Sequence, residues 1–222
     1  MWKQLAFRLS CLCIGVAITG AAFSLPARAA ETDPQVFLRT LADDAVAVLS
    51  DDRLDQAGRS EAFRQVLRRG FDIPAVSRFV LGRYWRRASS VEREEFIQLF
   101  EDYTVTVYGR RLGKNSGKFL SITGQRTVGL KDAIVHSKIK RENRPAVVLD
   151  WRMKQGEHGW KVVDIMAEGV SLAMAQRSEF TSVIRASGGK VAGLLTKLRK
   201  KSQTLAFNQR DGRHTGTAVK TQ

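Results

Sequence analysis

The spacing of apolar residues divides the chain into a helical part, a strand part and a second helical part. From Asp33 to about residue 112, apolar side chains recur every three or four positions, which is the period of one helix face. In residues 118–167 they alternate with polar side chains, which is the period of a strand. The helical period returns in residues 171–201. Helices followed by strands and then by helices predict an α+β fold with a twisted antiparallel sheet.

Four helices are predicted in the first part. The pair Asp33-Pro34 is typical of a helix start, with a capping side chain followed by proline at the first helical position. The polar stretch 51–59 is expected to be a loop, and Gly70 is expected to end the helix that follows it. Ser89 and Glu92 have the spacing of a capping box, which predicts the start of a long fourth helix.

The strand part contains about four predicted strands, in residues 119–123, 133–141, 146–154 and 160–166. In the third strand, one face carries apolar side chains, whereas the intervening side chains are mostly charged. The apolar ones are Val147, Leu149, Trp151 and Met153. One face of the sheet is therefore expected to be a core or the wall of a cavity, and the other face is expected to be hydrated.

The segment after the last strand couples the sheet directly to a helix, which the chain enters through Gly169. Asp164 is flanked by apolar residues, so we expect its carboxylate to accept hydrogen bonds from a neighbouring turn or an arginine. Glu168 is expected at the helix N-terminus, where a negative charge is favourable. Ser171 is expected to be a residue at the start of that helix.

The first 29 residues are typical of a secretory signal peptide. Two basic residues precede an apolar run from Leu9 to Leu25, and Ala27-Arg28-Ala29 suits cleavage after Ala29. The run is shorter than the roughly 20 residues that span a membrane. We therefore expect an exported mature chain, with residues 30–201 as a single domain. The polar, aperiodic residues 202–222 are expected to be disordered.

Removing the signal peptide changes what the composition implies. Both cysteines lie within it, so the mature chain has none, which excludes disulfides, thiolate metal sites and thiol nucleophiles. The three histidines lack metal-ligand spacing and there is no phosphate-binding loop, so no metal or other cofactor is predicted. The net charge falls from +15 for the whole chain to +12, which favours anionic partners.

A basic, aromatic cluster is formed by Arg83, Arg86 and Arg87 around Tyr84-Trp85. Such a cluster suits a phosphate group or a membrane surface, and it suits equally the capping and ion pairing of a helix end. The sequence leaves both uses open. One aromatic pair is too little for a nucleic-acid stacking platform, so no nucleic-acid partner is expected.

Several of these segments together resemble the MlaC family, also called the toluene-tolerance family. The similar segments are residues 71–74, Arg78, residues 81–86 and residues 160–171. The likeness extends from about Asp33 to Lys201. It implies a periplasmic auxiliary component of an ABC-type lipid transport system, with a nuclear-transport-factor-like sheet wrapped by helices and an added helical part.

The resemblance also implies partners and a role. A member of this family carries phospholipid between the outer and inner membranes and maintains outer-membrane lipid asymmetry. It docks in turn to an inner-membrane ABC lipid transporter complex and an outer-membrane lipoprotein complex, and we expect it to be a monomer. Because a branch associated with hopanoid metabolism shares the pattern, a hopanoid or other polycyclic lipid is an alternative ligand.

A carrier of this kind must cover acyl chains with apolar side chains. The candidate lining comes from the long fourth helix, the strands and the start of the fifth helix. It comprises Phe100, Tyr103, Val107, Ile122, Val135, Val147, Leu149, Trp151, Met153, Val163, Ile165, Val170, Leu172 and Met174. The alternative for each of these residues is ordinary core packing, which the same pattern would produce.

A second functional class is suggested by residues 169–173, Gly-Val-Ser-Leu-Ala, which partly match the Gly-x-Ser-x-Gly nucleophile elbow. Asp211 and His214 follow Ser171 in the order of a hydrolase triad. Alanine replaces the second glycine, the sheet is predicted to be antiparallel, and His214 lies in the segment predicted to be disordered. We therefore expect no enzyme activity, with a periplasmic serine hydrolase using Ser171 as the alternative.

Overall fold

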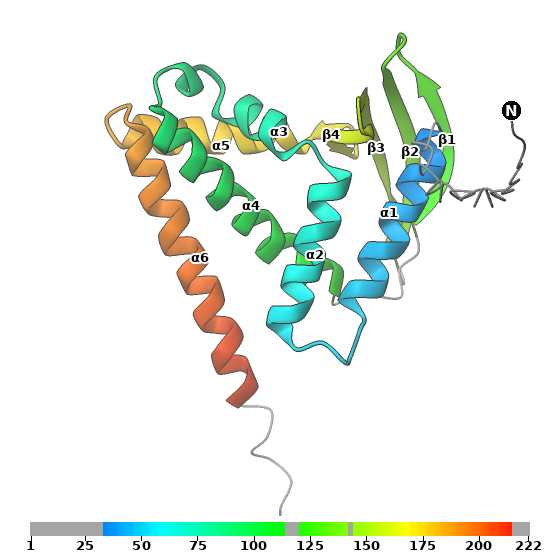
Figure 1. The fold of residues 1–222 in the computed structure, drawn as a ribbon, viewed down its shortest axis with the longest axis horizontal. Helices are drawn as coiled ribbons and strands as arrows, with labels where there is room; N and C mark the ends of the chain where they lie inside the picture. Colours follow the sequence, from blue (N-terminus) through cyan, green and yellow to red (C-terminus); the bar gives the residue numbers. More distant parts are fainter. Residues whose placement is uncertain (1–32, 114–119, 142–143, 215–222) are drawn as a thin grey trace, which may run out of the picture.

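The computed structural model describes residues 33–113, 120–141 and 144–214 (Figure 1). The predicted signal peptide lies outside these residues. The chain forms helices first, then an antiparallel sheet, then two further helices, as the change of hydrophobic period predicts. Among the described residues, no helix is long and apolar enough to cross a membrane.

The first three helices begin at side-chain caps. Helix α1 (Pro34–Leu49) starts after Asp33, whose carboxylate accepts a hydrogen bond from the backbone N–H of Gln35 at 2.7 Å. Helix α2 (Gln56–Gly70) starts inside the stretch predicted to be a loop, because Asp55 caps it through the N–H of Gly58. Helix α3 (Ile73–Leu81) follows, and a 3₁₀ helix, η1 (Gly82–Arg86), continues from its end.

The long helix α4 (Ser90–Gly113) begins with the predicted capping box. The hydroxyl of Ser89 accepts a hydrogen bond from the N–H of Glu92, and the carboxylate of Glu92 accepts one from the N–H of Ser89. The distances are 3.2 and 2.9 Å. Both residues thus satisfy backbone donors that the first helical turn leaves without partners.

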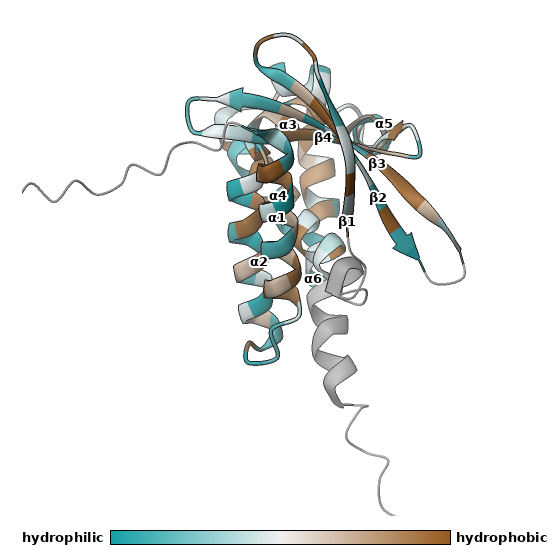
Figure 2. Cartoon of the chain, turned by 90° about the vertical axis from the view of Figure 1, so that its right-hand side faces the viewer, coloured by the Kyte–Doolittle hydropathy of each residue, from teal (hydrophilic) through white to brown (hydrophobic). Residues whose placement is uncertain are grey.

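Five antiparallel strands in sequential order make one open sheet, and their bounds are β1 (Leu120–Thr127), β2 (Asp132–Arg141), β3 (Arg144–Gly156), β4 (Gly159–Ala167) and β5 (Val170–Ser171). Strand β1 extends four residues beyond the predicted strand 119–123, and its register shifts between Ile122 and Gly124. The β2/β3 and β3/β4 pairs carry similar shifts. Such irregularities bend strands and increase their twist, and the sheet is strongly curved (Figures 1 and 2).

Two helices complete the chain, α5 (Leu172–Ala186) and α6 (Val191–His214). They are separated by Gly188 and Gly189, which both have the positive φ that glycine tolerates. Helix α6 continues to His214, into the polar segment from Ser202 that the sequence predicts to be disordered. Residues 215–222 lie outside the described part of the chain.

The apolar interior falls into three separate clusters. A helical cluster joins α3, η1, α4, α5 and α6, with Phe96, Phe100 and Phe180 at its centre. A sheet cluster packs Leu38 and Leu41 of α1 and Val66 of α2 against one face of β2, β3 and β4. A small third cluster lies between α2 and α4. Most domains have one contiguous core with minor satellites, so this division is unusual.

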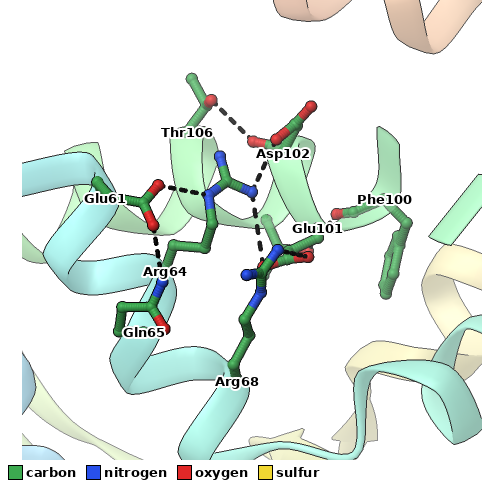
Figure 3. Close-up of polar contacts among 9 residues, drawn as sticks. Glu61, Arg64, Gln65, Arg68, Phe100, Glu101, Asp102 and Thr106 are labelled. Carbon is green, nitrogen blue, oxygen red and sulfur yellow. Dashed lines mark hydrogen bonds and ion pairs between the residues drawn. The ribbon is translucent and has the colours of Figure 1, made fainter. Parts of the chain in front are cut away.

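A polar network also joins α2 to α4 (Figure 3). Arg68 donates to both carboxylate oxygens of Glu101, at 2.6 and 3.2 Å, and Arg64 contacts Glu101 at 3.6 Å and Asp102 at 2.8 Å. Glu101 is buried, so these two guanidinium groups offset the cost of removing its charge from water.

Candidate functional site

The junction between β4 and α5 is held by Asp164 and Ser171. One carboxylate oxygen of Asp164 accepts a hydrogen bond from the Ser171 hydroxyl at 2.6 Å, and the other accepts one from the N–H of Ala173 at 3.1 Å. The Ser171 oxygen in turn accepts a bond from the N–H of Met174 at 3.0 Å. The prediction that Asp164 accepts hydrogen bonds from a neighbouring turn is confirmed, and Ser171 is the N-cap of α5.

Glu168 does not lie at the N-terminus of α5, which was its predicted position because a negative charge is favourable there. It lies in the turn between β4 and β5 with φ +49°, and its carboxylate accepts a hydrogen bond from the N–H of Val148 at 2.7 Å. Its own N–H donates to the carbonyl of Val148 at 3.0 Å. Ser171 takes the capping position instead, so Glu168 pairs with the middle of the sheet.

The predicted lining residues divide according to the cluster that they join. Those in the sheet cluster are Ile122, Val135, Trp151, Met153 and Ile165. Phe100 and Tyr103 join the helical cluster, on α4. Val135 and Met153 are fully buried against α1 and neighbouring strands, as ordinary core residues are. The others in the sheet cluster keep part of their surface accessible.

Five further predicted residues lie outside all three clusters: Val107, Val147, Leu149, Val163 and Leu172. Leu149 is only 8% exposed, and it lies opposite Ser137 on β2 and Ala167 on β4. The other four are half-buried. The structure therefore contains one buried and four half-buried apolar side chains that belong to none of the three clusters.

The structure does not bring Val170 and Met174 into this interior. Their exposed fractions are 60% and 54%. Val170 is in the short edge strand β5, and Met174 lies in the first turn of α5 on its outer side. The alternating and helical periods overlap at this junction, so the sequence pattern does not determine which side chains are buried there.

Sequence reasoning missed Ser137, a fully buried residue at the centre of the sheet. Its hydroxyl accepts a hydrogen bond from the indole N–H of Trp151 at 2.8 Å and donates to the carbonyl of Leu149 at 3.3 Å. These bonds fix the Trp151 ring on the inner face beside Leu149. The alternation of side chains along β2 could have predicted its burial, because it places residue 137 on the same face as Val135.

The hydrolase alternative finds little support in the surroundings of Ser171. Its hydroxyl donates a hydrogen bond to the carboxylate of Asp164 and accepts one from the backbone N–H of Met174. This is the geometry of a helix cap. His136 pairs with Asp150 at 2.7 Å on the sheet. The described residues contain no group of three or more histidine, cysteine or acidic residues that could hold a metal ion.

The arrangement of helices around an open antiparallel sheet matches a known fold. A phospholipid-binding protein from Ralstonia solanacearum, solved in complex with a phospholipid, superposes with a TM-score of 0.71 and 24% identity, over 79% of this chain and 99% of that one. The chain thus has the α+β fold of that protein.

The MlaC protein family model matches residues 39–200, so the chain belongs to the MlaC family. It is 24% identical over 189 residues to the intermembrane phospholipid transport system binding protein MlaC of Haemophilus influenzae. This alignment covers 81% of the chain and 87% of the relative. The resemblance seen in the sequence motifs is confirmed.

Proposed function

We propose that this protein is a periplasmic lipid carrier that covers the acyl chains of a phospholipid and moves the lipid between the outer and inner membranes. The observation that carries the proposal is Leu149, which is shielded from water but lies outside the three packed clusters. A ligand with apolar chains would cover the apolar surface that the half-buried residues Val107, Val147, Val163 and Leu172 leave accessible to water. The phospholipid named for the two relatives is a ligand of this chemistry.

The physical need for such a carrier follows from the cost of exposing acyl chains to water. Each methylene buried from water contributes roughly 0.8 kcal/mol, so a chain of about 16 carbons contributes on the order of 12 kcal/mol. Two chains make unassisted diffusion through water negligible. The headgroup needs no such cover, because removing its charges from water would itself be costly.

The proposed contact residues lie on the sheet and on the neighbouring helices. Leu149, Val147, Val163 and Leu172 would touch the acyl chains, and Val107 would touch them from α4. Ile122, Trp151, Ile165 and Tyr103, which are half-buried at the borders of the clusters, would complete the surface. Phe100, Val135 and Met153 would support it from within the packed clusters.

The transport role extends this binding activity. We propose that residues 30–201 act as one domain that docks in turn to an outer-membrane lipoprotein complex and an inner-membrane ABC lipid transporter. The protein would work as a monomer without enzyme activity. Export by a signal peptide would place it between the two membranes.

Native mass spectrometry of the protein purified from periplasm tests the proposal. We expect the mature chain together with the mass of one or more lipids, and extraction should identify the class of lipid. A phospholipid supports the main proposal, whereas a hopanoid would replace the ligand and keep the carrier role. A bare chain that also takes no lipid from vesicles would refute the carrier role.

The same preparation tests the hydrolase alternative. We expect no release of fatty acid from phospholipid by the wild-type protein, and none from Ser171→Ala. Release that disappears in Ser171→Ala would assign the serine a catalytic role and overturn our assignment of it as a helix cap.

A further inference from the structure

The surface formed by α3, η1 and α5 carries an excess of positive charge. Residues 73–88 contain four arginines and no acidic residue, and residues 172–186 contain two arginines and one acidic residue, Glu179. In Figure 1 the three elements lie beside one another along the upper side of the molecule. We call the six arginines on them the arginine surface: Arg78, Arg83, Arg86, Arg87, Arg177 and Arg185.

The arginine surface lacks neutralising partners. None of its six guanidinium groups forms an ion pair with a carboxylate in the described part of the chain. On α2, by contrast, Arg64, Arg68 and Arg69 are all paired with acidic residues of neighbouring helices. The positive field of the arginine surface is therefore available to an external partner.

Aromatic packing holds several of these arginines in place. Arg83 and Arg87 lie over the ring of Tyr84, at 5.1 and 5.8 Å from its centroid, and Arg83 also donates a hydrogen bond to the phenol oxygen at 3.1 Å. The neighbouring guanidinium groups of Arg83 and Arg185 lower the pKa of the Tyr84 hydroxyl. Because Tyr84 is buried, it fixes the cations without covering them.

The same surface exposes large apolar side chains. Phe79 is 41% exposed and lies under the guanidinium of Arg177 at 5.2 Å, and Met174 is 54% exposed one helical turn before Arg177. Gly82 makes this approach possible, since a Cβ there would meet the Arg177 guanidinium at 2.8 Å. Cations interleaved with exposed apolar side chains are typical of surfaces that lie on anionic lipid headgroups.

We propose that the arginine surface, with Phe79 and Met174, docks the protein directly on an anionic phospholipid bilayer. The cations would meet the lipid phosphates, and the two apolar side chains would enter the boundary between headgroups and acyl chains. This contact goes beyond the binding of a lipid inside the protein and does not depend on it. It would bring the carrier to the membrane independently of any protein complex.

Co-sedimentation with vesicles tests this docking. Vesicles of phosphatidylcholine and phosphatidylglycerol should bind the wild-type protein, and vesicles of phosphatidylcholine alone should not. Each cation near an anionic surface contributes about fivefold in affinity, so Arg78→Gln/Arg86→Gln/Arg177→Gln should bind roughly a hundredfold more weakly. These three positions avoid the arginines that pack on Tyr84. Binding should also weaken as salt is added.

A matched control separates position from net charge. The variant Arg39→Gln/Arg152→Gln/Lys197→Gln removes three exposed cations from other parts of the molecule and should bind nearly as the wild type does. A second variant, Phe79→Ser, should weaken binding about fivefold without changing the charge. Thermal unfolding of each variant shows that it is folded.

Several outcomes would overturn the proposal. Equal binding to neutral and anionic vesicles would do so, and so would equal losses in the triple variant and its control. If the triple variant binds vesicles normally but no longer binds an immobilised acidic peptide, the surface serves a protein partner. Lipid cargo measured on the same variants by native mass spectrometry should stay unchanged, so failure of docking and failure of cargo binding are distinguishable.

Discussion

The carboxylate of Asp164, in the C-terminal half of β4, accepts a hydrogen bond of 2.6 Å from the hydroxyl of Ser171, which caps α5. Seven residues separate them along the chain, and the turn between them is paired with β3 through Glu168. The sheet and the helix that follows it are thereby joined by charge-assisted bonds rather than by apolar packing alone.

Removing the cap should destabilise the protein. Ser171→Ala deletes the acceptor for the N–H of Met174 and the donor to Asp164, so we expect a loss of about 1 to 2 kcal/mol in the free energy of unfolding. Urea denaturation followed by circular dichroism measures it. Ser178→Ala, an exposed position on the same helix, is the control and should change stability little. Equal effects of the two variants would contradict the capping role.

Enlarging Leu149 should displace ligand. Leu149→Trp places an indole where we propose that acyl chains lie, and lipid occupancy measured by native mass spectrometry should fall several-fold. The control makes the same substitution at Leu130, which is 98% exposed in the β1–β2 turn, and should keep its lipid. Unchanged occupancy in a folded Leu149→Trp variant would argue that this side chain belongs to the core and not to the ligand surface.

Neutralising Glu101 should weaken the attachment of α2 to α4. Glu101→Gln leaves Arg64 and Arg68 without a buried carboxylate, and because Arg68 is itself half exposed we expect a cost of about 2 kcal/mol. Chemical denaturation gives the value, with Glu94→Gln, an exposed residue of the same helix, as control. A loss no greater than that of the control would show that the network in Figure 3 contributes nothing to stability.

The amine of Lys161 gives a prediction for pH. It donates to the carbonyls of Arg68 and Arg69 at the end of α2, and partial burial lowers its pKa below the usual 10.5. The unfolded chain then binds the proton more strongly than the folded chain does. The stability of the wild type should therefore rise relative to Lys161→Met as the pH approaches 10.5 from below.

Urea titrations at several alkaline pH values measure this difference, with Lys138→Met on the exposed face of β2 as the control. The control should show no such change of the difference with pH. A difference between wild type and Lys161→Met that stays constant from neutral to alkaline pH would contradict the lowered pKa.

The parts of the fold that follow from local chemistry could be predicted from the sequence. Local sequence patterns were sufficient to predict the helix caps at Asp33 and Ser89 and the inward face of β3, because each of these features depends on residues close together in the chain. Glu168 was misplaced because its partner, Val148, is 20 residues away. The helix past Ser202 was missed because its residues are polar and aperiodic.

The candidate site was predicted less completely, for a physical reason. An apolar residue on a strand has the same pattern whether it contacts protein or ligand, so Met153 and Leu149 could not be separated. Only the structure distinguishes them, because Met153 belongs to the cluster that includes Leu38 and Leu41 of α1, whereas Leu149 does not. Val170 and Met174 lie where one period gives way to another, and there the burial depends on how the helix leaves the sheet.

The stacked rings of Phe96 and Phe100 on α4 meet Phe180 of α5 edge-on, about eighty residues later in the chain. During synthesis or export, α4 therefore emerges long before the helices that cover its apolar face. Until α5 and α6 follow, that face is open to aggregation or to a chaperone that shields it. The helical half of the protein can close only after the last quarter of the chain has arrived, so a chain truncated before α5 should be degraded or aggregate.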